Sequence, residues 1–466
     1  MLEKEPGFNP EREPEVGPVP APGEEERPYF DTEKELFNKL SDEEREKRIK
    51  GSGDETSAIQ AYGLELALKS IDKGEVQKSP EEQAEFEKMV GAARNVISAF
   101  EIQRSPDNKK GENLVIVTDP GANKTMIEAL YEAGREAAGA DCRVVISEKP
   151  TGSAQPFGKV IDERLSNADC VLLMTSISRT HSPGMAALVT PHPNEAIAQL
   201  RTVRQKARGG EFPANARFIS ITQTRPEILT EGAALENLDQ MRERVQGIRE
   251  IMRDVESVHI TSKNGTDLEL DIKQDKTIVD DGKINVPGKA ANFPFGEWSS
   301  AVDLENTNGT LVVDGVSTPP VGELDEPIIL TIEKGMVTDI KGGEAAERLK
   351  TALDEANRVW REKHPEDTKT NAYKVAELGI GVNSKAFRYT PDGHRVAPPT
   401  SLEGEKGLGT IHIALGKNAL FGVSKEDPDF NAPDVHIDNV IMETSVVGKK
   451  EDGSEVTIIE KGKAKF

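Results

Sequence analysis

Residues 405–440 read EKGLGTIHIALGKNALFGVSKEDPDFNAPDVHIDNV, and this stretch contains two short apolar runs typical of β-strands. Each run has a histidine where an apolar residue would be expected, His412 in the first and His436 in the second. Side chains two residues apart on a strand share one face, so His436 and Asp438 point the same way. His412 can meet them from a neighbouring strand. The pattern predicts two strands that bring together two imidazoles and a carboxylate.

Two imidazoles and a carboxylate on rigid strands are typical ligands of a divalent metal ion. A single His-x-Asp sequence is weak evidence, because most strand histidines are ordinary core or surface residues. The chain has only seven histidines, however, and two of them interrupt apolar strands in this one region. The sequence therefore favours a metal site here.

Composition restricts the class of protein. The chain has 466 residues with 59 basic and 82 acidic side chains, a net charge of −23, and its mean hydropathy is −0.53. An acidic surface repels nucleic acid and anionic membranes. No apolar run of about 18 residues and no secretion signal occur, so we expect a cytoplasmic protein that binds neither nucleic acid nor membrane. Cys142 and Cys170 lie in apolar runs and are expected to be buried thiols.

The N-terminal half predicts an α/β domain behind a tail. Residues 1–30 are rich in proline and glutamate, which leaves too little apolar surface to offset the entropy of ordering. We expect a disordered, acidic, proline-rich N-terminus within a disordered or weakly helical tail over 1–50. From 51 to 255, helical patterns alternate with short apolar runs, which predicts a parallel sheet with helices on both faces. The apolar runs lie at 114–118, 142–147, 169–175 and 217–222.

The C-terminal half, residues 256–466, has the pattern of an α+β domain. Short β segments are separated by turn residues, and one helix is expected near 343–362. Residues 259–272 predict a hairpin that turns at Asn264-Gly265. We place the domain boundary near 255.

The α/β half contains no nucleotide-binding motif. The strand at 114–118 runs into TDPGANK rather than a Gly-x-Gly-x-x-Gly turn, and no phosphate-binding Gly-Lys-Ser/Thr loop is present. Residues 175–184, TSISRTHSPG, follow another strand end, where open sheets place ligands. A helix-capping loop is a more frequent explanation of that stretch than a catalytic role for His181.

Two glutamates of the second half lie in apolar, glycine-rich segments, Glu297 in NFPFGEW and Glu377 in VAELGIGVN. A carboxylate in such a setting is costly unless it is paired or coordinates a cation. With His412, His436 and Asp438 they make five potential ligands. One catalytic zinc normally takes three protein ligands, so this set fits two ions that share a carboxylate, an arrangement suited to hydrolysis of an amide or ester. Taken singly, each glutamate is more often a salt-bridged structural residue.

Two further acids, Glu403 and Glu405, precede the first histidine strand in LEGEKGLG. They are candidates for general acid–base catalysis or for binding a substrate ammonium group. A solvated turn explains them equally well.

Five motifs in order, NFPFGE, NGTLVVDG, AELGIGVN, EKGLGTIHIALG and HID, resemble the thermophilic aminopeptidase T/S family, whose members are often called leucyl aminopeptidases. The resemblance runs from about residue 111 to 448. It implies an α/β domain followed by a catalytic domain, two zinc or cobalt ions, release of N-terminal residues from peptides by an activated water, and a homodimer. The implied ligands are Glu297, Glu377, His412, His436 and Asp438. Our candidates for the catalytic residues are Glu405 and Glu377.

The sequence departs from that family at Ala419, where some members have a tyrosine, at Gly404, and in the acidic insert at 423–435. The fold is also shared, by resemblance, with an iron-dependent dioxygenase that opens a dihydroxypyridine ring. In that alternative, two histidines and an aspartate would form a triad for one Fe(II) ion. The two glutamates favour two ions, so we place the dioxygenase second and a non-catalytic metal- or peptide-binding protein third.

Overall fold

A computed structural model describes residues 28–75, 78–104, 111–149, 165, 168–176, 216–222, 225–389, 395–396, 398 and 400–466 of the chain. The segment 1–27 of the predicted tail and the loop that carries His181 lie outside these residues. The helical patterns at 156–166 and 193–208 of the predicted α/β domain lie almost entirely outside them as well.

Four helices begin the described part of the chain: α1 (Pro28–Asn38), α2 (Asp42–Ser52), α3 (Glu55–Lys73) and α4 (Pro80–Ser98). Most of residues 28–50 of the predicted tail thus lie in two helices. The first, α1, is attached by Phe37, which packs on Ala58 and Ile59 of α3. The start of α4 is fixed by a capping box between Ser79 and Glu82, which satisfies two backbone N–H groups that lack helical partners.

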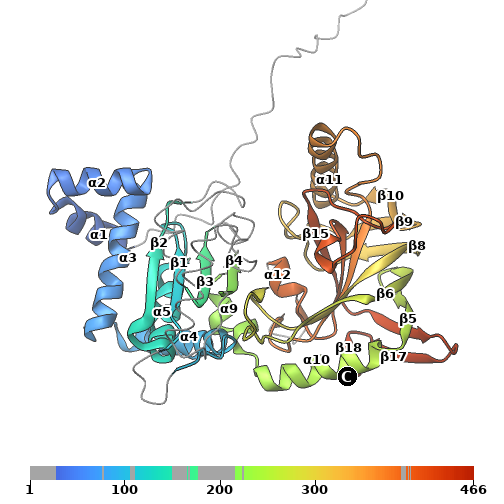
Figure 1. Cartoon of the computed structure of the whole chain (residues 1–466), viewed down its shortest axis with the longest axis horizontal. Helices are drawn as coiled ribbons and strands as arrows, with labels where there is room; N and C mark the ends of the chain where they lie inside the picture. Colours follow the sequence, from blue (N-terminus) through green and yellow to red (C-terminus); the bar gives the residue numbers. More distant parts are fainter. Residues whose placement is uncertain are drawn as a thin grey trace, which may run out of the picture.

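The predicted parallel sheet is confirmed, with strand order β2-β1-β3-β4-β7. Figure 1 shows β2, β1, β3 and β4 side by side. Four strands come from the expected apolar runs: β1 (Leu114–Thr118), β2 (Cys142–Ile146), β3 (Cys170–Thr175) and β4 (Arg217–Thr222). The helix α5 (Lys124–Ala138) packs against β1 and β2, and α4 packs on α5; a 3-10 turn, η1 (Gly139–Asp141), follows α5. Cys142 and Cys170 are free, buried thiols, as expected. The fifth strand, β7 (Ala290–Asn292), returns from the C-terminal half and pairs with β4.

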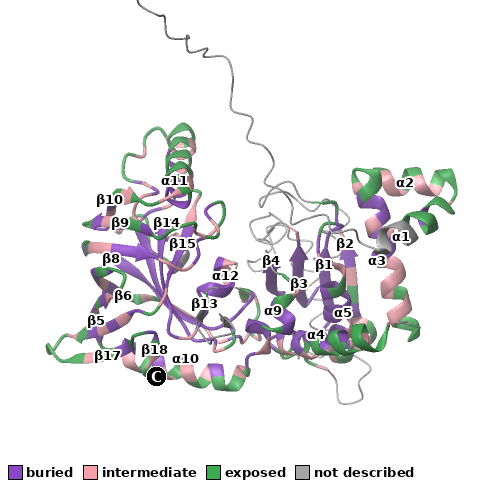
Figure 2. Ribbon diagram, turned by 180° about the vertical axis from the view of Figure 1, so that it is seen from behind, coloured by how far each residue is buried: buried purple, intermediate pink, exposed green. Residues whose placement is uncertain are grey.

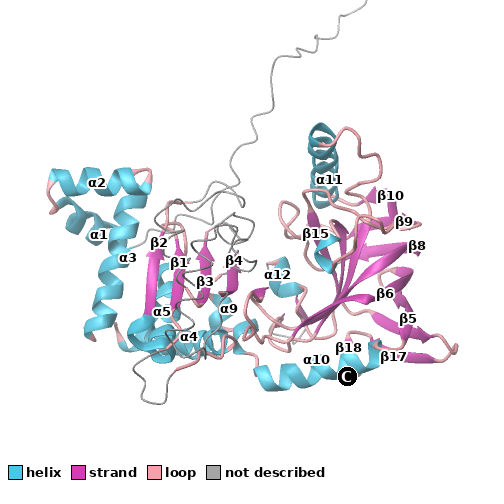
Figure 3. Cartoon of the chain, viewed as in Figure 1, coloured by secondary structure: helices cyan, strands magenta, loops and turns pink. Residues whose placement is uncertain are grey.

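The C-terminal half is built on a strongly curved antiparallel sheet (Figure 3). Its strand order is β15-β14-β11-β8-β6-β5-β16-β17-β18, with β9 paired to β8 and β10 paired to β9. The chain enters it through α9 (Glu227–Thr230), η2 (Ala233–Leu235) and α10 (Leu238–Met252). The expected hairpin over 259–272 is formed by the first two strands of this sheet and turns at Gly265. The strands are β5 (Val255–Thr261), β6 (Asp267–Asp280), β8 (Glu297–Val313), β9 (Ile328–Glu333), β10 (Met336–Lys341), β11 (Val375–Gly381), β14 (Ile411–Gly416), β15 (His436–Ile441), β16 (Ser445–Lys450), β17 (Glu455–Glu460) and β18 (Lys463–Ala464).

Smaller elements complete this half. The one expected long helix is α11 (Glu344–Lys363), which packs on β9 and β10. A short hairpin of β12 (Arg388–Tyr389) and β13 (Arg395–Val396) precedes α12 (Ser401–Gly404), and η3 (Ala419–Phe421) follows β14. Figure 2 shows the central strands of both sheets as buried. Among the described residues, every helix is too short or too polar to cross a lipid bilayer.

Candidate metal site

The five predicted ligands lie on four strands that are neighbours in the curved sheet, in the order β15, β14, β11 and β8. The register explains why they meet. Ala414 of β14 is opposite both Glu377 on one side and Asp438 on the other. His412 is opposite Gly379, and Glu297 is opposite Gly381. The juxtaposition expected from the alternating sequence is therefore present, and the role of these side chains as ligands remains a prediction.

Glu377 is the centre of the group. Its Oε1 lies 3.3 Å from His412 Nε2 and its Oε2 lies 3.0 Å from His436 Nε2. Asp438 Oδ1 is 3.2 Å from the His436 nitrogen and 3.9 Å from the His412 nitrogen. Glu297 Oε2 lies 3.7 Å from His412 Nε2. Potential ligand atoms form two sets that share Glu377, one with Glu297 and His412 and the other with His436 and Asp438.

The tautomer of His436 suits metal binding. Its Nδ1 lies 2.7 Å from the backbone oxygen of Lys417. A carbonyl oxygen only accepts hydrogen bonds, so Nδ1 must donate, and in the neutral ring the lone pair is on Nε2, which faces Glu377 and Asp438. A hydrogen bond of this kind orients metal-binding histidines and fixes their tautomer.

The site is closed on the His412 side and partly open on the His436 side. His412 is 1% exposed, whereas the side chains of His436 and Asp438 are 23% and 15% exposed. Gly379 makes the closed side possible, because a Cβ at this position would overlap the His412 ring. Among the described residues, the group is therefore more exposed on its β15 side.

Thr318 supports Asp438 from outside the group. Its hydroxyl donates to Asp438 Oδ2 at 3.1 Å, and it accepts the Asp438 N–H at 3.0 Å. We expect Thr318→Val to weaken metal binding about 10–100-fold, the usual effect of losing an outer hydrogen bond to a ligand. Titration with Co²⁺ would measure it. Thr338→Val, at an exposed threonine of β10, should leave the affinity unchanged, and equal losses in both variants would contradict the supporting role of Thr318.

The charges of the group stabilise one another. Burial alone would lower the pKa of His412, but the carboxylates of Glu377 and Glu297 raise it to about 9. Burial alone would raise the pKa of Glu377, but the two imidazoles lower it to about 2. The pKa of His436 lies well above its usual value, because Asp438 and Glu377 outweigh the effect of burial. A divalent cation bound among these carboxylates would take the place of the positive charge that the two protonated imidazoles supply.

This coupling predicts a pH dependence for chelator-treated protein. The folded-state pKa of His412 is raised from 6.5 to about 9, so its stabilising contribution is complete below 6.5 and is lost as the pH rises through about 9. The melting temperature of the metal-free chain should therefore fall across this window. Calorimetry at several pH values would measure the effect, and His412→Gln should remove this contribution. An equal slope in that variant would assign the effect to other groups.

The first turn before β14 contains a residue that the sequence analysis missed. Lys406 Nζ lies 2.5 Å from Glu297 Oε2 and 2.9 Å from Glu405 Oε1. The sequence signal was available, since a lysine in the apolar, glycine-rich run EKGLGTI needs a buried partner, but its partner could not be identified. Glu405 is only 5% exposed, and burial raises its pKa to about 8. The alternative prediction that Glu403 and Glu405 lie in a solvated turn is therefore wrong.

Glu403 does not join the group. It is 2% exposed, and its Oε1 accepts the N–H of Ala233 in η2 at 2.8 Å. It thus ties α12, which leads into the site, to the segment that connects the two sheets.

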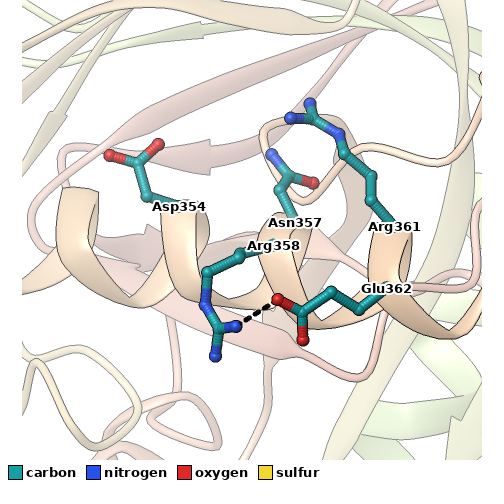
Figure 4. A pocket seen from close by; sticks show the side chains of 5 residues that line it. All are labelled: Asp354, Asn357, Arg358, Arg361 and Glu362. Carbon is teal, nitrogen blue, oxygen red and sulfur yellow. Dashed lines mark hydrogen bonds and ion pairs between the residues drawn. The ribbon is translucent and has the colours of Figure 1, made fainter.

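A surface hollow of about 340 Å³ lies over α11 (Figure 4). It is lined by Asp354, Asn357, Arg358, Arg361 and Glu362. Arg358 pairs with Glu362 across one helical turn, an arrangement typical of a solvated helix face. None of these residues belongs to the metal-binding group, so we assign this hollow no part in the site.

Comparisons with known proteins give two kinds of similarity. Residues 98–446 match the family described as NicX: 2,5-dihydroxypyridine 5,6-dioxygenase. The enzyme of that name from Pseudomonas putida KT2440 is 25% identical over 236 residues, which are 48% of this chain and 63% of the relative, less than two thirds of its length.

Solved structures support the fold. The 2,5-dihydroxypyridine dioxygenase of P. putida KT2440 superposes with a TM-score of 0.53 at 18% identity, covering 81% of this chain and 96% of that one. Wild-type AmpT from Thermus thermophilus superposes with a TM-score of 0.51 at 14% identity, covering 82% and 99%. The second similarity agrees with the predicted aminopeptidase-type fold. The family match instead favours the dioxygenase that the sequence analysis placed second.

Proposed function

Because the chain belongs to the 2,5-dihydroxypyridine 5,6-dioxygenase family, we propose that it is a metal-dependent dioxygenase that opens the ring of a dihydroxypyridine or a closely related dihydroxy heteroaromatic compound. The observation that carries this proposal is the extent of the match. It spans residues 98–446 and thus includes all five members of the metal-binding group. Membership in an enzyme family also makes the non-catalytic alternative the weakest of the three hypotheses.

The donor set fits a single iron ion. His412, His436 and Asp438 would hold it, since two histidines and one carboxylate with open positions are the ligand set of non-heme Fe(II) oxygenases. The Nε2 atoms of both rings lie within 3.9 Å of Asp438 Oδ1. Bound Fe(II) would supply the one-electron chemistry with O₂ that amino-acid side chains lack.

The side chains around this triad would define the rest of the reaction site. Glu377 lies between the two rings and would keep them oriented, because each of its oxygens faces one Nε2. The buried His412 side would exclude water. The partly exposed His436 and Asp438 would form the face that a planar aromatic substrate approaches.

A metallo-aminopeptidase with two divalent ions, zinc or cobalt, is the second candidate. The specific observation in its favour is that Glu377 belongs to both potential ligand sets, as a bridging carboxylate would. The fold shared with AmpT is compatible with it. In this alternative Glu405 would be the acid–base residue, and a homodimer acting on peptides, as first expected, stays a prediction.

Two parallel assays separate these candidates. Chelator-treated protein is loaded anaerobically with Fe²⁺, and O₂ consumption is measured with 2,5-dihydroxypyridine together with loss of the ring absorbance. The same preparation loaded with Zn²⁺ or Co²⁺ is tested on a panel of aminoacyl-anilides. We expect turnover in the first assay only. Release of the aniline with no O₂ consumption would overturn the dioxygenase proposal in favour of the peptidase.

A further inference from the structure

We propose that the ammonium group of Lys406 occupies the position that a second metal ion would take, and so limits this centre to one ion. The inference rests on the proposed function only in assuming that the centre binds a divalent ion. It goes beyond the single iron ion of that proposal by naming the side chain that keeps a second ion out.

The contacts of Lys406 place its charge on one particular atom. Its Nζ lies 2.5 Å from Glu297 Oε2, and this same oxygen faces His412 Nε2 at 3.7 Å. Glu297 is one of the three residues of the Glu297–Glu377–His412 ligand set. A second ion bound there would meet a buried positive charge at close range, where the repulsion is poorly screened. The lysine therefore competes directly with that ion.

The carboxylates around Lys406 could also hold a cation of higher charge. Glu405 Oε1 is 2.9 Å from its Nζ, and the carboxylate of Asp280, opposite Glu297 in the register of β6 and β8, adds negative charge beside it. Among the described residues, Glu405 Oε2 has no hydrogen-bond partner although Glu405 is 5% exposed. Three carboxylates around one lysine leave acceptor capacity that a divalent ion, with its larger charge and several coordination positions, would fill.

The lysine is held in place by its backbone. Asn383 donates its N–H to the Lys406 carbonyl at 2.8 Å and accepts the Leu408 N–H at 2.9 Å. The side-chain amide of Asn383 donates to the carbonyls of Ala233 and Phe295. The turn that carries Lys406 is thus fixed to both halves of the chain, and its 7% exposed side chain has little freedom to leave Glu297.

Counting bound ions tests the proposal without an activity assay. Wild type, Lys406→Met and Lys406→Arg are stripped with a chelator and dialysed against Co²⁺, and cobalt per chain is measured by elemental analysis together with the cobalt absorption spectrum. We expect one ion in wild type and in Lys406→Arg, which keeps the charge, and two in Lys406→Met. Lys78→Met is the matched control, because it removes a lysine paired with the single carboxylate of Glu128, and we expect one ion.

Each outcome is decisive. Two ions in wild type, or one in a folded Lys406→Met, would overturn the inference while leaving a metal-dependent enzyme in place. No ion in wild type would overturn both the inference and the proposed function. If Lys406→Met does not fold, Lys406→Gln carries the same expectation of two ions, and the wild-type count still tests the limit to one.

Discussion

Glu377→Gln should lose metal binding at this centre, and turnover with it. The substitution keeps the volume of the side chain but removes the negative charge that faces both His412 Nε2 and His436 Nε2. It also places an amide that donates hydrogen bonds where a carboxylate accepted them. Loss of an outer hydrogen bond to a ligand already costs about 10–100-fold in affinity, so we expect a loss on the order of 100-fold or more here.

Cobalt titration of the purified variant measures the affinity, and circular dichroism shows whether the sheet is intact. Glu333→Gln, at an exposed glutamate of β9, is the control that removes a charge from the same sheet without touching the site. We expect it to bind metal as wild type does. Unchanged affinity in Glu377→Gln would show that the five side chains meet without forming a metal centre.

The strands that carry the site could be predicted because their sequence has period two. His412 and His436 each interrupt an apolar alternation, and that alternation fixes which face of the strand they occupy. The continuous apolar runs of the first half likewise predicted β1 to β4 within about one residue at either end. Local patterns of this kind depend on the backbone geometry of a single element, and a sequence contains that information.

The features that the sequence did not predict depend on contacts between distant segments. The three-residue strand β7 pairs with β4 across the expected boundary at 255, and nothing in its own composition marks it as part of the parallel sheet. The ion pair of Lys406 could not be predicted either, because its partner Glu297 is 109 residues away in the sequence. We infer that the choice between one and two metal ions depends on this contact. An ordered set of motifs therefore could not distinguish an aminopeptidase from a dioxygenase with the same fold.

The largest effect on stability is expected from Arg217→Met in β4. Arg217 is 1% exposed, and its Nη2 lies 2.6 Å from an oxygen of Glu112, which is fully buried. Its Nη1 donates to the carbonyl of Phe100 at 2.7 Å, and its Nη2 also contacts the sulfur of Cys170 at 3.0 Å. Removing the arginine leaves a buried carboxylate and a buried carbonyl without this donor. Breaking a buried ion pair from one side costs about 3–5 kcal/mol, and we expect a loss of this size in the unfolding transition of the α/β half.

Urea denaturation followed by circular dichroism would measure the loss, and two further variants show its cause. The double variant Glu112→Met with Arg217→Met has no uncompensated buried charge. Its stability should therefore recover relative to the single variant, because apolar pairs often replace buried ion pairs at little cost.

The surface control is Arg358→Met. It removes an arginine whose pairs with Glu355 and Glu362 are half exposed on α11, and it should cost no more than about 1 kcal/mol. If Arg217→Met cost no more than this surface control, the buried pair would not be what joins β4 to the segment before β1. Recovery in the double variant would assign the loss to the charge left on Glu112 rather than to the lost packing volume of the arginine.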